Sequence, residues 1–256
     1  MTEAAARWGW RAGSVAVTLG VIALWEAVAG WRLVSPVFLP TPLATFAALR
    51  DGLVGGGDLW PLIGGTVERM LLGWLLASLV GVAVGALIGV SAAARAWLQP
   101  TLEFIRPIPA SSVMPIAIAI FGLSKSMVLA VVAFGSLWPV LLATVHGFAA
   151  IEPRLDEVAR VLRLSRLAFV AKMGLPNALP DIFAGLRLSL TVSLILSVVG
   201  EMLSSQSGLG LAILLAARSF HAADLFASVA LLGAIGYASN ALLLAAERRV
   251  LAWRFA

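Results

Sequence analysis

Several stretches of this chain are long enough to cross a membrane and carry no charged side chain. Residues 70–94, 107–124, 126–151 and 225–246 contain no Asp, Glu, Lys or Arg. A helix needs about 20 apolar residues to cross a hydrocarbon core roughly 30 Å thick. The pattern therefore predicts an all-α integral membrane protein.

The composition agrees with lipid as the surroundings of most of the chain. Of the 256 residues, 61% are hydrophobic and 12% are charged, whereas average soluble domains carry roughly 25% charged residues. A soluble domain of this size would have too few charges to cover its surface. This excludes a soluble enzyme, a disordered tail and a fibrous protein. The sequence contains no Cys, which excludes disulfides, thiolate metal sites and cysteine nucleophiles.

About six transmembrane helices are predicted, in a single transmembrane domain covering residues 1–256. Two of these spans contain charges: the first carries Glu26, and the fifth carries Arg187 and Glu201. Residues 33–49 are predicted to form a Pro-broken loop and then a surface helix, and residues 209–217 are too short to span. The predicted spans are about 13–30, 70–93, 108–123, 127–149, 182–203 and 225–246.

The first span has a competing interpretation as a cleaved signal peptide. Ala27, Val28 and Ala29 match a small-x-small cleavage site. The apolar region is longer than in a typical signal peptide, however, and Glu26 and Trp25 lie beside the site. We therefore prefer an uncleaved first span.

The basic residues predict the orientation. With both termini in the cytoplasm, twelve of the 18 basic residues lie in inside segments and five lie outside, and the reverse orientation would invert this bias. The net charge of +5 is therefore a topology signal and not a sign of nucleic-acid binding. The inside residues are Arg7, Arg11, Arg95, Arg106, Arg154, Arg160, Arg163, Arg166, Lys172, Arg248, Arg249 and Arg254.

The longest polar break, residues 152–181, reads as two short helices between the fourth and fifth spans. Pro153 can begin the first of them, and Ser165 can cap the second. The first helix has one apolar stripe at helical spacing, formed by Leu155, Val158, Ala159 and Leu162. This pattern is equally consistent with an interfacial amphipathic helix and with a docking element for a cytoplasmic partner.

This break resembles the EAA signature of bacterial binding-protein-dependent ABC importer permeases. Glu157, Ala159, Leu175 and Pro176 lie at the spacing of that signature. Arg163 stands where the signature has Gly, and Met173 stands where it has Ile, in each case at the same spacing. We expect Arg163 to change how sharply the loop turns.

Other segments resemble the nitrate, sulfonate and taurine branch of these permeases. The resemblance covers roughly residues 35–250. It includes Thr66-x-x-Arg69 with Gly73, Arg106-Pro107-Ile108-Pro109 with Pro115, Phe121-Gly122, Ala184-Gly185-Leu186-Arg187, Gly200-Glu201-Met202, Gly208-Leu209-Gly210 and Leu39-Pro40-Thr41-Pro42.

The resemblance implies a type I ABC importer permease fold in the bacterial inner membrane, with two permease copies forming the pathway. Each copy would insert its loop 152–181 into an ABC ATPase dimer, which binds the ATP and Mg, while an external solute-binding protein delivers a sulfonate, taurine, nitrate or similar anion. The same branch also includes transporters of pyrimidine precursors. This chain itself would bind no cofactor and no nucleic acid. The residues expected to couple to the ATPase are Glu157, Ala159, Arg160, Leu162, Arg163, Leu175 and Pro176.

A stripe of small residues recurs every four positions along the second span. It consists of Gly73, Ala77, Gly81, Gly85 and Gly89. Small residues on one face let membrane helices approach closely. We expect this face to pack against another span of the same chain, and a contact with the second permease copy is the alternative.

Two charges lie within the predicted fifth span, where an ionisable residue is by default a functional candidate. Arg187 is near enough to the cytoplasmic end to extend its charge out of the lipid. Glu201 either lines the pathway or pairs with a neighbouring helix, and pairing is preferred because an acid would repel an anionic solute. His146 is expected to be packed or interfacial, and no His-x-x-x-His spacing indicates a metal site.

Two other functions are considered. A rhomboid-type intramembrane serine protease would use Ser91 or Ser124 of a Gly-x-Ser triplet, but only His146 lies within a span as a base. An ion-coupled secondary transporter often has repeated halves and several buried ionisable residues. No convincing internal repeat is found in this sequence, and charges inside the predicted spans are few. An ATPase within this chain is excluded because neither Lys125 nor Lys172 follows a Gly, as a phosphate loop requires.

Overall fold

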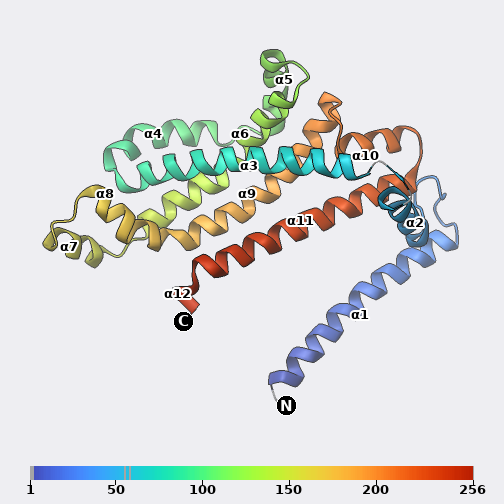
Figure 1. The fold of residues 1–256 in the computed structure, drawn as a ribbon, viewed down its shortest axis with the longest axis horizontal. Coiled ribbons are helices and arrows are strands. Elements are labelled where there is room, and N and C mark those ends of the chain that lie inside the picture. The colour runs from blue at the N-terminus through green and yellow to red at the C-terminus, as the bar shows by residue number, and fades with distance from the viewer. Residues whose placement is uncertain (1–2, 55, 58, 256) are drawn as a thin grey trace. The chain divides into compact units, whose positions relative to one another are not determined.

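A computed structural model describes residues 3–54, 56–57 and 59–255 of the chain. Every regular element in these residues is a helix (Figure 1). The helices are α1 (Glu3–Gly30), α2 (Pro42–Leu53), α3 (Leu59–Val90), α4 (Ala92–Ile105), α5 (Ala110–Phe121), α6 (Lys125–Ala149), α7 (Pro153–Val161), α8 (Arg166–Phe169), the π-helix η1 (Val170–Gly174), α9 (Leu175–Ser204), α10 (Leu209–Arg218), α11 (Ala222–Val250) and α12 (Ala252–Phe255).

The chain divides into two compact units. The first unit comprises Met1–Pro61 and Ala212–Leu232, and the second, here called the core unit, comprises Leu62–Leu211 and Gly233–Ala256. In the first unit the indole of Trp25 on α1 donates a 2.9 Å hydrogen bond to the carbonyl of Pro40. The side chain of Thr41 accepts a hydrogen bond from the backbone of Ala44 and so caps α2, as the Pro-broken loop followed by a helix predicted.

In the core unit α3 and α6 run parallel to each other along a face of small residues. A Cβ added at Gly73 would meet Val132, and one added at Gly81 would meet Val140. Gly85 and Gly89 lie in the same way against Thr144 and Phe148. The contacts advance in the same direction along both helices, which fixes their relative direction.

Helix α9 runs antiparallel to α6 and packs closely against it. Gly147 near the end of α6 faces Ala178 near the start of α9, and Gly200 near the end of α9 faces Val128 near the start of α6. The hydroxyl of Ser189 on α9 also donates a 2.7 Å hydrogen bond to the carbonyl of Ser136 on α6. The α3, α6 and α9 helices thus form the centre of the core unit and lie side by side in Figure 1.

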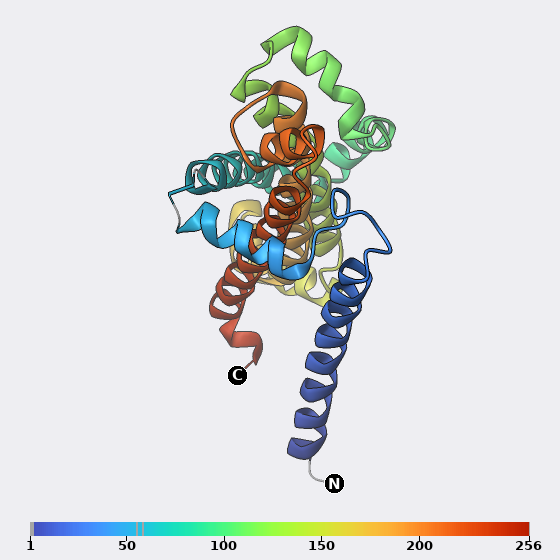
Figure 2. The same ribbon diagram turned by 90° about the vertical axis from the view of Figure 1, so that its right-hand side faces the viewer.

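The third predicted span, residues 108–123, is not one straight helix. In the structure the helix in this stretch is α5, which has 12 residues. At 1.5 Å per residue it is about 18 Å long, which is shorter than the hydrocarbon core of a membrane. Helix α5 meets α4 at a bend of 91° (Figure 2, where α4 is seen nearly end-on). Pro107 and Pro109 lie at the break, where they cannot donate the backbone hydrogen bonds that would continue a helix.

The bent pair still returns the chain across the core unit. Because α3 and α6 are parallel, the segment between them must run from the end of α3 back to the start of α6. Helix α4 lies against the second half of α6, where Leu102 and Leu141 line one small cavity. Helix α5 lies against the first half, where Met114 packs with Met127. Five described helices are long and apolar enough to cross a membrane, and the bent pair makes up to six, which agrees with the predicted number.

Two of the predicted boundaries that differ from the structure lie beside polar residues. Helix α3 begins at Leu59, whereas the second span was predicted from residue 70. Helix α9 begins at Leu175 and continues through Pro180, whereas the loop was predicted to end at residue 181. In both cases the first turns of the helix contain polar residues. Because the prediction starts each span at an uncharged stretch, it places the start of the helix too far along the chain.

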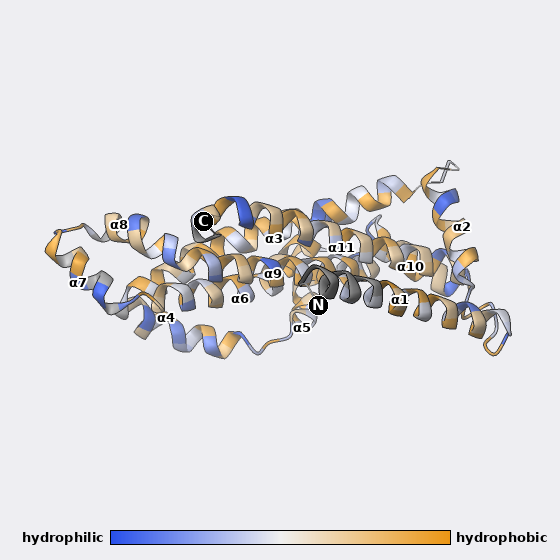
Figure 3. Cartoon of the chain, turned by 90° about the horizontal axis from the view of Figure 1, so that it is seen from below, coloured by the Kyte–Doolittle hydropathy of each residue, from blue (hydrophilic) through white to orange (hydrophobic). Residues whose placement is uncertain are grey.

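Large apolar side chains remain exposed along the long helices. Leu79 on α3 is 71% exposed, Ile120 on α5 is 69% exposed, and Leu242 on α11 is 73% exposed. Figure 3 shows apolar residues along much of these helices and polar residues gathered at α4 and α7. In water such apolar surface would be unfavourable, and it is what helices in contact with lipid present.

Candidate functional site

The segment between α6 and α9 is a compact run of short helices. Helix α7 ends in a turn in which the backbone N–H of Leu164 donates to the carbonyl of Ala159 at 3.0 Å. The hydroxyl of Ser165 then accepts a hydrogen bond from the backbone of Ala168 and caps α8, as predicted from the sequence. The π-helix η1 follows without a break and leads directly into α9. We call residues 150–174 the coupling segment.

Among the described side chains of α7 and of Leu162, which directly follows it, only Ala159 is buried. Glu157 is exposed, and Val161 and Leu162 are 82% and 61% exposed. Ala159 is 5% exposed and faces the protein. Of the described members of the predicted apolar stripe, Val158 and Leu162 are exposed and Ala159 is buried. The side chains of Leu155, Asp156 and Arg160 lie outside the described residues.

Arg163 adopts a left-handed backbone conformation, with φ of 49°. Glycine takes this conformation without a steric cost, whereas other residues clash with their own backbone. This explains why the EAA signature has Gly at this position. With Arg163 in this left-handed conformation, the segment turns after α7.

Leu175 and Pro176 are the first two residues of α9. Proline fits there because the first helical positions have no intrahelical use for a backbone N–H. In the structure no turn separates η1 from α9, so Pro176 lies within continuous helix. It lines a pocket of about 610 Å³ together with Lys172, Asn177 and Trp253.

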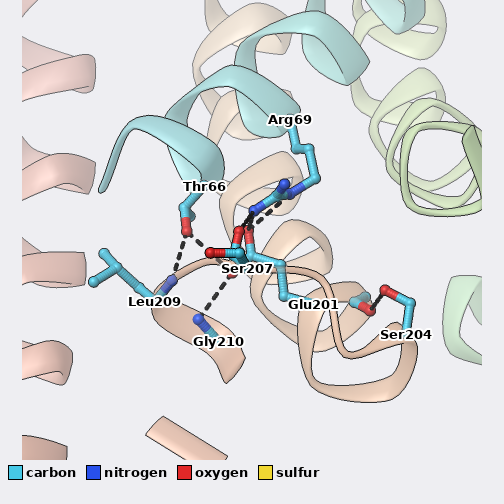
Figure 4. Close-up of polar contacts among 8 residues, drawn as sticks. Thr66, Arg69, Glu201, Ser204, Ser207, Leu209 and Gly210 are labelled. Carbon is cyan, nitrogen blue, oxygen red and sulfur yellow. Dashed lines mark hydrogen bonds and ion pairs between the residues drawn. The ribbon is translucent and has the colours of Figure 1, made fainter. Parts of the chain in front are cut away.

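Glu201 is completely buried and is the centre of a hydrogen-bond network that joins α3, α9 and the start of α10 (Figure 4). Arg69 donates to one carboxylate oxygen from Nε at 3.0 Å and from Nη2 at 2.8 Å. Thr66 Oγ1 and the backbone N–H of Gly210 donate to the other oxygen at 3.0 and 2.8 Å. Each carboxylate oxygen of Glu201 thus accepts two hydrogen bonds from donors of the same chain.

The network also holds the loop between α9 and α10. Arg69 Nη2 donates to the carbonyl of Ser207 at 2.6 Å, and Thr66 accepts from the N–H of Leu209 at 2.9 Å. A Cβ at Gly208 would overlap the Glu201 carboxylate, and one at Gly210 would overlap the carbonyl of Val198. The glycines of the Gly208-Leu209-Gly210 motif are therefore required by the close approach of this loop to Glu201.

The sequence signal for Arg69 and Thr66 was their spacing. Residues three apart lie on the same face of a helix, so the Thr66-x-x-Arg69 pattern presents a hydroxyl and a guanidinium together. The pattern does not say which acid they meet, because Glu201 is 132 positions away from Arg69 in the sequence.

Arg187 lies against α11 in the same unit. Its Nη2 is 2.8 Å from Glu247 Oε2, and the two side chains are 36% and 12% exposed. The indole of Trp74 on α3 donates to the carbonyl of Leu186 beside it, at 3.0 Å. Arg187 therefore links α9 to α11, and no pattern in the sequence indicates Glu247 as its partner.

The five small residues of the α3 stripe lie on the face that meets α6. Gly73, Gly81, Gly85 and Gly89 each contact an α6 side chain, and Ala77 is 2% exposed. In the described part of the chain, this face of α3 therefore packs against α6 of the same chain.

The serines considered for a protease have other roles. Ser91 Oγ accepts a hydrogen bond from the backbone of Ala94 and caps α4, and Ser124 Oγ does the same for Met127 at the start of α6. The side chain of His146 is 74% exposed, with Nδ1 3.7 Å from Asp181 Oδ2, so it is not packed. Among the described residues, no group of His, Cys, Asp and Glu could hold a metal ion.

Comparison with known proteins gives consistent similarities. Residues 77–252 match the family described as "Binding-protein-dependent transport system inner membrane component". The chain is 32% identical over 248 residues to the protein named as an aliphatic sulfonates transport permease, SsuC, of Bacillus subtilis, covering 97% of this chain and 89% of that one. It is 33% identical over 186 residues to the nitrate import permease protein NrtB of Leptolyngbya laminosa, covering 73% and 66%. It is 29% identical over 257 residues to the taurine transport system permease protein TauC of Escherichia coli, covering 96% and 93%.

Proposed function

Since the chain belongs to the family of binding-protein-dependent transport system inner membrane components, as an ABC importer permease of the nitrate, sulfonate and taurine branch, we propose that it forms the pathway by which a small oxoanion enters the cell. It is a permease subunit and not an enzyme, with the type I ABC permease fold and several membrane-spanning helices. As such it works with an ATPase and a solute-binding protein.

The observation that carries the proposed mechanism is the exposed surface of α7. Glu157 and the apolar side chains of Val161 and Leu162 are uncovered at one end of the core unit. An exposed apolar patch beside charged residues is typical of a protein-binding surface. We assign this surface to the ATPase dimer, which binds the ATP and Mg. Movement of the ATPase would then reach the spans through the coupling segment and the start of α9. The residues proposed for this role are Glu157, Ala159, Arg160, Leu162, Arg163, Leu175 and Pro176.

The proposed orientation places the coupling segment and both termini in the cytoplasm. It rests on the excess of basic residues in the segments that would face inward. The bacterial inner membrane then surrounds the apolar surfaces of the long helices. A second copy of this chain would complete the pathway, and the solute-binding protein would dock at the opposite membrane face.

The proposed solute class follows from the relatives. Their names specify aliphatic sulfonates, nitrate and taurine. A further relative, 30% identical over 227 residues, is named a bicarbonate transport system permease protein. All of these are small molecules with an oxoanion group. A buried Glu201 whose charge is fully met by Arg69 and its other donors would not repel such an anion. We therefore propose a sulfonate, taurine, nitrate or similar anion as the solute.

Reversing the charge of Glu157 tests the docking assignment. In the complex with its ATPase and solute-binding protein, Glu157→Lys is expected to abolish ATP-dependent uptake into vesicles while leaving membrane insertion intact, because it reverses the charge on the docking surface. The matched control is Glu152→Lys, which makes the same change at an exposed residue of the coupling segment that precedes α7.

Normal uptake by the Glu157→Lys complex, with the ATPase still bound, would show that α7 is not the docking element. Equal loss of uptake in the Glu152→Lys control would show that any charge reversal in this segment has the same effect, and would also count against the assignment of Glu157.

A further inference from the structure

Phe148 lies at the junction of the coupling segment with three long helices. It is in the last turn of α6 and is 3% exposed. With Ala178 and Ile182 of α9 it forms a buried cluster. Partly buried side chains around this cluster come from α3 and from η1, including Ala86 and Val170. Phe148 thus lies where α3, α6, η1 and α9 come together.

Two glycines make room for Phe148 on opposite sides. A Cβ at Gly89, near the end of α3, would overlap the Cβ of Phe148. A Cβ at Gly174, the last residue of η1, would lie 2.8 Å from the ring atom Cε1 of Phe148. The base of the side chain is therefore held against α3, and the edge of its ring is held against the coupling segment.

Phe148 differs in this respect from the other α6 side chains along the same helix contact. Val132, Val140 and Thr144 also fill glycine positions on α3. Among the described residues, Phe148 is the member of this row that also lies against η1. Interiors are close-packed, so a shift of one element must displace the side chains that it touches.

The π-helix makes η1 a suitable element to move. A π-helical turn has poorer packing of its backbone than an α-helix and is common at functional sites. Val170–Gly174 is continuous with α9, so a rotation or shift of the coupling segment changes the position of Gly174 before it changes the rest of α9.

We propose that Phe148 is the positioning residue that transmits movement of the coupling segment to α3. This inference depends on the proposed function, because it assumes that the ATPase moves the coupling segment. A shift of η1 pushes the ring of Phe148 at Gly174, and the base of the side chain moves α3 at Gly89. The helices of the pathway and the ATPase then change state together.

The test is the number of solute molecules imported per ATP hydrolysed by the complete complex in proteoliposomes. Phe148→Ala is expected to lower this ratio about five- to tenfold, within the usual range of coupling between sites, while the complex still assembles and hydrolyses ATP. The control is Val132→Ala, which removes a buried side chain from the same α3–α6 contact far from the coupling segment and should leave the ratio unchanged. A normal ratio in Phe148→Ala, or an equal fall in Val132→Ala, would overturn the proposal.

A second test enlarges the side chain at position 174 and shortens the one at position 148. It can be carried out even if Phe148→Ala folds poorly. Gly174→Ala adds a methyl group against the ring and is expected to lower the ratio. Adding Phe148→Leu removes the edge of the ring and is expected to recover part of it. A double variant with no higher ratio than Gly174→Ala would overturn the proposal.

The two proposals fail in different ways. Normal uptake by Glu157→Lys would contradict the docking of α7 to the ATPase. Loss of uptake by Glu157→Lys together with a normal ratio in Phe148→Ala would leave the docking intact and contradict the role of Phe148 alone.

Discussion

At the scale of single residues, Glu201 shows what a charge within this fold requires. Its two carboxylate oxygens receive donors from Arg69, Thr66 and the backbone of Gly210, and its side chain has no exposed surface. A buried ion pair contributes little beyond an apolar pair of the same shape, but removal of one partner leaves an uncompensated charge. The network is therefore sensitive to single substitutions.

Arg69→Met tests this sensitivity. It removes the guanidinium and leaves Glu201 buried without its cation, so the free energy of unfolding is expected to fall by about 3–5 kcal/mol. Unfolding with SDS in mixed micelles would measure the change. The double variant Arg69→Met with Glu201→Leu is expected to recover most of the loss because no charge remains buried.

The control for this prediction is Lys125→Met. It breaks the ion pair with Glu68, whose side chains are 43% and 53% exposed, and exposed pairs contribute little to stability. If Lys125→Met and Arg69→Met lowered the free energy of unfolding equally, burial of the Arg69–Glu201 pair would not be the cause of the loss.

The sequence alone indicates the roles of several residues, but it does not indicate which residues they contact. Pairing of Glu201 was preferred over a pathway role, and Thr66 and Arg69 stood out as a motif. Which groups meet depends on how α3 and α9 pack, since the two residues of the ion pair are 132 positions apart. The left-handed backbone at Arg163 was likewise unexpected, because an arginine gives no local signal for that conformation.

At the scale of elements, the glycine stripe determines how closely α3 approaches α6. A Cβ at Gly81 would lie 3.1 Å from the Cβ of Val140 and 3.2 Å from the backbone N of Leu141. A backbone atom cannot move aside as the end of a flexible side chain can. The helices are therefore close only because these positions carry no side chain.

Gly81→Leu is expected to destabilise the chain by about 1–3 kcal/mol, the usual cost of overpacking. The control is Gly64→Leu on the same helix, where a Cβ would meet no atom within 4 Å. Unfolding of the single chain in detergent, without partners, is the measurement. A destabilisation seen only in the assembled complex would contradict the intrachain role of the stripe and favour a contact between copies.

Element boundaries were less predictable than the presence of the elements. Stretches without charge locate apolar helices, because a charge in lipid is costly. They do not report whether a helix is continuous, and the uncharged residues 107–124 include the break between α4 and α5. They also miss helical residues that carry satisfied charges, such as Arg69 in α3.

At the scale of the whole molecule, the direction of the helices explains how the chain uses its apolar segments. Parallel α3 and α6 require a return between them, and the bent α4–α5 pair provides it. The coupling segment then lies at one end of the core unit, and the Glu201 network lies at the other end of α9. Both the fold class and the family could be anticipated from the sequence, because spans and the EAA spacing are local patterns. The solute could not, since no residue in the spans selects among small anions.

We propose that this chain imports a small oxoanion only together with an ATP-hydrolysing partner. The direct measurement is uptake of labelled sulfonate, taurine, nitrate and bicarbonate into proteoliposomes that contain the complete complex. We predict accumulation of at least one of these anions that requires ATP and the solute-binding protein and that persists when ion gradients are collapsed. Uptake that proceeds without ATP and stops when the ion gradients are collapsed would contradict the account.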